Sequence, residues 1–158
     1  MGRSRGFDEQ EVTRAAVTLF AARAYDGLSV DDLVTHLGVH RNSLYKTFGS
    51  KRGLYLTALH WYLQHELEPL LTAAGDAGST TAAMDLLLTA GPALDLLLVA
   101  AVERAPVDAE VAAAVTATLA RLDAALQRAQ TNGGTGTVPA ANLTAELLGL
   151  RTRARISA

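Results

Sequence analysis

The chain has 158 residues, of which 49% are hydrophobic, so it can bury a core and is too apolar to be intrinsically disordered. It has no cysteine, which excludes disulfides and a cysteine-ligated zinc site and is typical of a reducing cytoplasm. The net charge of −2 is unevenly spread, because residues 1–62 hold eight Lys and Arg against six Asp and Glu, and residues 63–158 hold six against ten.

The first predicted helix begins at Asp8. Glu11 follows three residues later, which is the spacing of a capping box. We expect one apolar face on this helix, formed by Val12, Ala16, Leu19 and Phe20. Gly27 is a natural end for this segment.

Two short helices and the start of a longer one follow. Ser29 is a good cap for the second helix, which ends before Gly38. A third helix starts near His40 and ends at Gly49, and Ser50 caps a fourth that runs towards residue 71. Two short helices joined by a Gly-containing turn predict a helix-turn-helix, although plain helical bundles contain such junctions too.

The same region is unusually poor in acids. Between Leu33 and His65 there is no Asp or Glu, whereas Arg41, Lys46, Lys51 and Arg52 all lie there. Local positive charge attracts phosphate, so the stretch suggests a nucleic-acid surface. The alternative is a solvated helix face that happens to lack acids.

The second half predicts further helices separated by loops. We expect a helix over residues 82–90, a break at Gly91 and Pro92, and a helix to about residue 104. Asp108 caps a long helix to about residue 130, and a last helix spans about residues 140–155. The apolar stretch over residues 86–102 is interrupted by Pro92 and Asp95, and we interpret it as a buried helix pair and not a membrane span.

The segment from Leu28 to Leu54 resembles the DNA-binding region of the tetracycline-repressor (TetR) family, and the resemblance covers about residues 7–62. The matching residues are Ser29, Gly38, Val39, Leu44, Tyr45, Phe48, Ser50, Lys51 and Leu54. Two residues depart from the family pattern, which commonly has Ser or Thr in place of His40 and Gly in place of Asn42.

The resemblance implies that the N-terminal half of the third helix enters the major groove of DNA. The candidates for base contacts are Arg41, Asn42 and Ser43, because Arg favours guanine and Asn favours adenine. The candidates for phosphate contacts are Ser29, Tyr45, Lys46, Lys51 and, in an N-terminal arm, Arg3 and Arg5. Tyr45 can also be a packing aromatic, and the arm can be a frayed end without a role.

The resemblance also implies a homodimer formed by the last two helices. The predicted interface consists of Val115, Leu119, Leu122, Leu126, Leu143, Leu147 and Leu150. The alternative is that these apolar stripes complete the core of the single chain. We favour the dimer, because two-fold symmetry lets a helix-turn-helix protein contact two half-sites, as in a palindromic operator.

Members of the family often bind a small molecule between the DNA-binding unit and the dimer bundle. The predicted pocket residues are Trp61, Tyr62, His65, Met84, Leu88 and Glu103, although each can equally be a core residue. We therefore expect a dimeric repressor that a small-molecule effector releases from double-stranded operator DNA. The alternative is a DNA-binding organiser or anchor of the same fold, controlled by a protein partner and without a small ligand.

The expected fold is all-α, with a helix-turn-helix domain over residues 1–49 and a regulatory and dimerisation bundle over residues 50–158. We expect no enzyme, since the sequence has no P-loop, no G-x-S-x-G motif and no nucleophile beside an evident base. No metal and no cofactor are expected, because His65 and Glu68 supply at most two ligands. The expected location is the cytoplasm, in association with the nucleoid and not a membrane.

Overall fold

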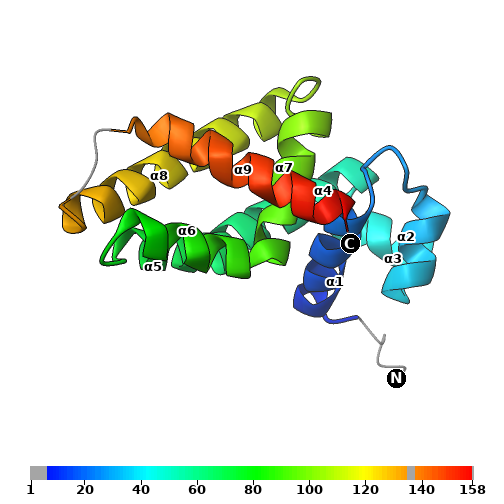
Figure 1. Cartoon of the computed structure of the whole chain (residues 1–158). Helices are drawn as coiled ribbons and strands as arrows, with labels where there is room; N and C mark the ends of the chain where they lie inside the picture. The colour runs from blue at the N-terminus through cyan, green and yellow to red at the C-terminus, as the bar shows by residue number, and fades with distance from the viewer. Residues whose placement is uncertain (1–6, 135–137, 158) are drawn as a thin grey trace. The chain divides into compact units, whose positions relative to one another are not determined.

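A computed structural model of the chain describes residues 7–134 and 138–157. These residues form helices and turns without any strand, which confirms the all-α prediction (Figure 1). The chain divides into two compact units, the first ending at Tyr62 and the second beginning at Leu63.

The first unit contains the helix-turn-helix. Its helices are α1 (Glu9–Ala22), α2 (Val30–Leu37), α3 (Arg41–Phe48) and α4 (Lys51–Tyr62). The predicted caps are present at α1, α2 and α4. The Asp8 carboxylate accepts the backbone N–H groups of Gln10 and Glu11, and the Ser50 hydroxyl accepts that of Gly53 at 2.9 Å.

Helix α4 completes the core of this unit by packing against α1 and α3. The rings of Phe20 on α1 and Tyr55 on α4 meet edge to face, with their centroids 5.0 Å apart, and both are fully buried. The sequence suggested a boundary between residues 49 and 50. The compact unit instead extends to Tyr62, because α4 supplies core side chains such as Leu54 and Leu59.

The second unit is built from short helices around one long helix. In chain order these are the π-helical segment η1 (Leu63–Leu67), α5 (Glu68–Gly75), α6 (Thr80–Thr89), the 3₁₀ segment η2 (Gly91–Leu94), α7 (Asp95–Val99), the π-helical segment η3 (Ala100–Arg104), α8 (Ala109–Asn132) and α9 (Ala140–Ile156). Helix α8 packs against α5, α6, η3 and α9. The predicted cap of α8 is confirmed, since the Asp108 carboxylate accepts the backbone N–H groups of Glu110 and Val111.

The predicted break at Gly91 and Pro92 is also confirmed. The chain bends by 91° between Thr80–Thr89 and Gly91–Arg104, because proline cannot continue the α-helical hydrogen bonding. Among the described residues, no single helix is long and apolar enough to cross a membrane. The bent pair meets that test only jointly, by length and composition.

The burial of the apolar stripes on α8 and α9 contradicts most of the predicted dimer interface. Five of its seven residues are buried inside the chain itself, namely Val115, Leu122, Leu126, Leu143 and Leu147. Leu119 is half-buried, and Leu150 is exposed. The five buried side chains form the core of the unit, so a second chain cannot reach them in this fold.

An ion pair joins α7 to α9. The Asp95 carboxylate accepts two hydrogen bonds from Arg151, from Nε to Oδ1 and from Nη2 to Oδ2, both at 2.8 Å. Each side chain is only 16% exposed, and Arg155 adds a second cation 3.7 Å from Oδ1. This hydrogen bonding raises the pKa of Arg151. Paired in this way, the two charges can lie inside an otherwise apolar bundle.

We expect Asp95→Ala to lower the free energy of unfolding by about 2 kcal/mol, because Arg151 would keep a largely buried charge without its partner. The measurement is urea unfolding of the native and variant chains. Glu68→Ala is the matched control, because it breaks the much more exposed Glu68–Arg121 pair and should cost less than about 1 kcal/mol. Equal losses for the two variants would contradict this account of the buried pair.

Candidate nucleic-acid interface

A capping box fixes the start of α2. The Asp32 carboxylate accepts hydrogen bonds from the backbone N–H and the hydroxyl of Ser29, at 2.8 and 2.6 Å, and the Ser29 hydroxyl accepts the Asp32 N–H at 3.0 Å. These bonds lower the pKa of Asp32, because they stabilise its ionised carboxylate. The Ser29 side chain is thus engaged in the cap, and its phosphate contact stays a prediction.

A left-handed glycine makes the turn between the two helices. Gly38 has φ +65°, a conformation that other L residues adopt at a cost, and its N–H bonds to the Val34 carbonyl. Helix α3 then begins after His40, which provides no side-chain cap. The turn therefore depends on the backbone freedom of Gly38, and the polar start of α3 is left open.

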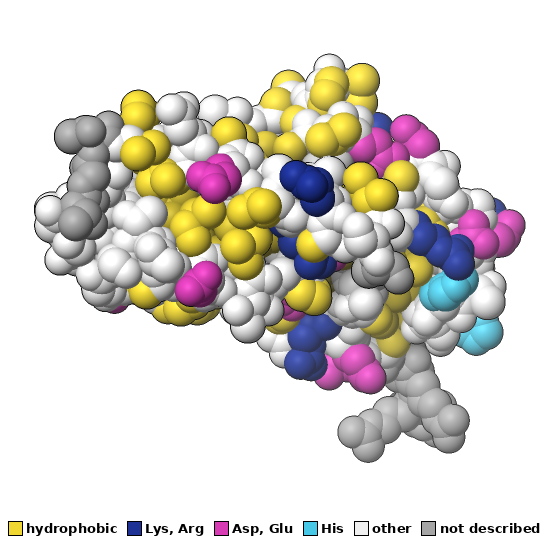
Figure 2. Space-filling view, in the orientation of Figure 1, with side chains coloured by type: hydrophobic (Ala, Val, Ile, Leu, Met, Phe, Trp, Pro, Cys, Tyr) yellow, Lys and Arg dark blue, Asp and Glu magenta, His cyan; other side chains and the backbone are white. Residues whose placement is uncertain are grey.

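The inner face of α3 is anchored and its outer face is exposed. Leu44 is fully buried and Phe48 nearly so, which fixes the rotation of the helix. The predicted contact residues Arg41, Asn42, Tyr45 and Lys46 are all exposed, and Ser43 is half-buried. Tyr45 keeps 38% of its surface exposed, which favours an outward role over packing. Figure 2 shows Lys, Arg, Asp, Glu and His side chains gathered over α2 and α3.

Arg41, the first residue of α3, is held by an acid from α2. Its Nη2 donates a hydrogen bond to Oδ1 of Asp31, ten residues earlier in the chain. The carboxylate raises the pKa of Arg41. This pair could not be predicted from the sequence, because two residues on either side of a turn have no fixed spacing that periodicity could reveal.

Lys51 also has intramolecular partners. Its Nζ donates to the backbone carbonyl of Leu28 and lies 4.1 Å above the centre of the Tyr25 ring. This ammonium group therefore ties the start of α4 to the segment before α2. A phosphate contact by Lys51 stays a prediction, and Arg3 and Arg5, two further predicted phosphate ligands, lie outside the described residues.

The predicted effector-binding residues are divided between the units. Trp61 and Tyr62 end α4 in the first unit, and the other four residues, His65, Met84, Leu88 and Glu103, lie in the second. Met84 and Leu88 stand one turn apart on α6 and are half-buried, while His65 is exposed. Figure 2 shows hydrophobic side chains gathered on the second unit over α6 and α9.

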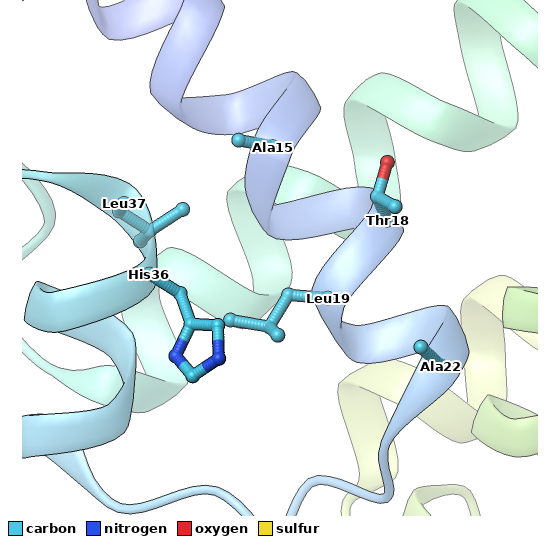
Figure 3. A pocket seen from close by; sticks show the side chains of 6 residues that line it. All are labelled: Ala15, Thr18, Leu19, Ala22, His36 and Leu37. Atoms are coloured by element: carbon cyan, nitrogen blue, oxygen red, sulfur yellow. The ribbon is translucent and has the colours of Figure 1, made fainter.

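A hollow of about 380 Å³ lies elsewhere, between α1 and α2 of the first unit (Figure 3). Its lining is Ala15, Thr18, Leu19, Ala22, His36 and Leu37. The imidazole of His36 donates from Nδ1 to the Asp32 carbonyl at 2.7 Å and lies beside Leu19. None of the predicted pocket residues lines this hollow. Within the described residues, no group of three or more His, Cys, Asp or Glu could hold a metal ion.

A capped α2, a glycine turn and an α3 with an exposed polar face define a helix-turn-helix protein. Residues 12–58 match the family model described as bacterial regulatory proteins, tetR family. The chain is 45% identical over 64 residues to the uncharacterized HTH-type transcriptional regulator YezE of Bacillus subtilis (40% of this chain, 33% of YezE). It is 39% identical over 69 residues to the HTH-type transcriptional repressor BdcR of Escherichia coli (44% and 35%). The matched segments thus span about a third of these curated relatives.

Solved structures resemble the whole chain. A cysteine mutant of the TetR family transcriptional regulator CifR, complexed with 26bp double-strand operator DNA, superposes with a TM-score of 0.78 at 24% identity, covering 99% of this chain and 91% of CifR. PfmR from Thermus thermophilus, also a TetR family transcriptional regulator, gives a TM-score of 0.59 at 21% identity, covering 92% and 83%. Residues 12–58 thus resemble the helix-turn-helix part of tetR family regulators, and the whole chain shares the fold of the solved structures.

Proposed function

We propose that the chain binds a specific operator in double-stranded DNA through α3 and regulates transcription, as a dimeric repressor released by a small-molecule effector. The observation that carries the proposal is the outer face of α3. Arg41, Asn42, Tyr45 and Lys46 are exposed there while Leu44 is fully buried, so the helix presents its polar face outward. The operator DNA in the CifR complex and the repressor name of BdcR support this interpretation.

The exposed side chains of α3 are suited to two kinds of contact with DNA. Lys46 is a flexible point charge suited to phosphate, and Asn42 near the start of α3 suits the edge of adenine. Phosphate contacts release counterions and make binding depend on salt, whereas base contacts set the sequence preference.

We expect Lys46→Ala to weaken binding to all duplexes alike and to flatten the slope of log affinity against log salt by about one unit. Asn42→Ala should leave that slope unchanged, alter the preferred sequence and cost about 1–3 kcal/mol on the native consensus. The measurement is selection from a randomised duplex library, followed by titration at several salt concentrations. Thr47→Ala, also exposed on α3, is the control. A native chain that enriches no sequence would refute the proposal.

The proposed dimer uses the outward faces of α8 and α9. On α8 this face carries Ala113, Thr116, Ala117, Ala120 and Ala124, and on α9 it carries Ala141, Ala145, Gly149 and Thr152. All nine residues are exposed, uncharged and small, and a Cβ added at Gly149 would meet open space. Small side chains let two helix pairs approach closely, which supports a bundle of α8 and α9 with their copies.

Light scattering should show a dimer for the native chain and a monomer for Ala145→Arg, because a charged side chain in the close-packed interface would lose its hydration. Ala73→Arg, on the exposed side of α5, places the same charge outside the proposed interface and should stay dimeric. A native chain that is monomeric at micromolar concentration would contradict the proposed dimer. A dimeric Ala145→Arg variant would show that the interface lies elsewhere.

The effector is proposed to bind the second unit, where Met84 and Leu88 on α6 are half-buried. Figure 2 shows hydrophobic side chains gathered over α6 and α9 in this unit. A second candidate is control by a protein partner. It is favoured by Val102 and Val107, which are 78% and 71% exposed near the start of α8.

The two candidates differ in whether the binding of a small molecule is coupled to the binding of operator DNA. A small-molecule effector must bind less tightly when operator is present, by the same factor by which it weakens DNA binding, typically about 5–150-fold. The measurement is a thermal-shift screen of small apolar molecules, followed by titration of each hit with and without the selected duplex. Equal affinity in both titrations excludes induction by that molecule. If none binds, control by a protein partner becomes the better explanation.

A further inference from the structure

The ion pair between Asp31 and Arg41 joins an acid to a predicted base-reading residue. Asp31 lies in the first turn of α2, and Arg41 is the first residue of α3. Both side chains remain open to solvent, at 80% and 49% exposure, so neither is held by the core. Among the described residues, the carboxylate of Asp31 therefore orients the guanidinium of Arg41.

Asp31 is not needed for the cap of α2. Asp32 forms the capping box with Ser29 through both its carboxylate and its backbone N–H. Asp31 therefore contributes one negative charge beside the outer face of α3. It stands just before the long stretch of the chain that contains no acid, where such a charge repels the phosphates of any duplex.

We propose that Asp31 is a specificity-determining positioning residue, which holds Arg41 towards a base edge and away from the phosphates. The inference rests on the proposed DNA-binding function and deepens it. Asp31 lowers affinity for DNA in general and raises the discrimination between sequences.

The geometry of the guanidinium leaves room for both partners. Arg carries five N–H donors in a planar fork, and the hydrogen bond to Asp31 uses one of those on Nη2. The second N–H of Nη2 remains free to act beside the N–H of Nη1 or of Nε, and such a parallel pair matches the two acceptors of guanine, O6 and N7. Arg41 can therefore stay bound to Asp31 while it contacts guanine.

Without the carboxylate, Arg41 has a competing use. A long, exposed Arg side chain with no fixed partner samples many rotamers, and the phosphates of DNA are the most abundant acceptors within its reach. A phosphate contact adds affinity that is independent of sequence. The loss of Asp31 therefore increases binding to arbitrary DNA while it weakens the base contact.

The test compares duplexes and not only variants. The native full chain first selects a consensus from a randomised duplex library, and dissociation constants are then measured on this consensus and on a scrambled duplex of the same composition. The variants are Asp31→Asn, which keeps the shape of the side chain, Asp31→Ala, Arg41→Ala and the double variant Asp31→Asn/Arg41→Ala. Glu11→Gln removes an equal charge from the first turn of α1 and is the matched control.

Asp31→Asn and Asp31→Ala should bind the scrambled duplex more tightly than the native chain, with a salt slope steeper by about one unit. The ratio of the two dissociation constants should fall by about 5–150-fold, the range of one bidentate base contact. In the Arg41→Ala background, Asp31→Asn should change that ratio by less than about twofold, because its effect acts through Arg41. Glu11→Gln should leave the ratio unchanged.

The proposal is overturned if Asp31→Asn keeps the native ratio, or if it weakens both duplexes equally with a lower melting temperature, because Asp31 would then only stabilise the turn. An Asp31→Asn effect that persists without Arg41 would also overturn it. If Asp31→Ala does not fold, Asp31→Asn alone decides. A native chain that selects no consensus overturns the proposed DNA-binding function itself, whereas a consensus with an unchanged ratio overturns this inference alone.

Discussion

The burial of one side of α3 is the constraint on which the rest of the candidate site depends. A helix of eight residues has little stability of its own, so its position is set by the core that it joins. Leu44 and Phe48 lie in that core, one turn apart, and this fixes the rotation of the helix about its axis. Arg41, Asn42 and the three residues between the anchors then face outward, because no other orientation of the helix buries both Leu44 and Phe48.

The same core accounts for the importance of α4 to the first unit. Tyr55 contacts Phe20 of α1 and the ring of Tyr25, and Tyr25 in turn lies beneath the ammonium group of Lys51. Lys51 also bonds to the Leu28 carbonyl, one residue before the cap of α2. A chain of aromatic and cationic contacts thus joins α1, the start of α2 and α4. A substitution at Lys51 would alter this chain of contacts as well as remove a charge, so Lys46 reports more cleanly on phosphate binding.

Local chemistry made most of the fold predictable, and tertiary contacts limited the rest. The caps at Ser29, Ser50 and Asp108 act within three residues, so the sequence alone located the helix starts. The interface predicted through Leu122 and Leu147 was wrong for a different reason. Periodicity shows which face of a helix is apolar, but a stripe buried by the same chain has the same period as one buried by a partner. The Asp31–Arg41 pair was missed because it crosses a turn between two helices.

The correction to α8 and α9 changes what a dimer of this chain must be made of. Because most of the large apolar residues of α8 are already buried, the outward faces offer mainly alanine, glycine and threonine, whose burial gives little hydrophobic free energy for each residue. Such faces gain stability mainly from close approach and many van der Waals contacts, which require a precise fit. A precise fit would also fix the geometry between the two copies of the α8 and α9 pair. Small residues at the outward faces therefore favour a defined packing of the two helix pairs over a large hydrophobic contribution to dimer stability.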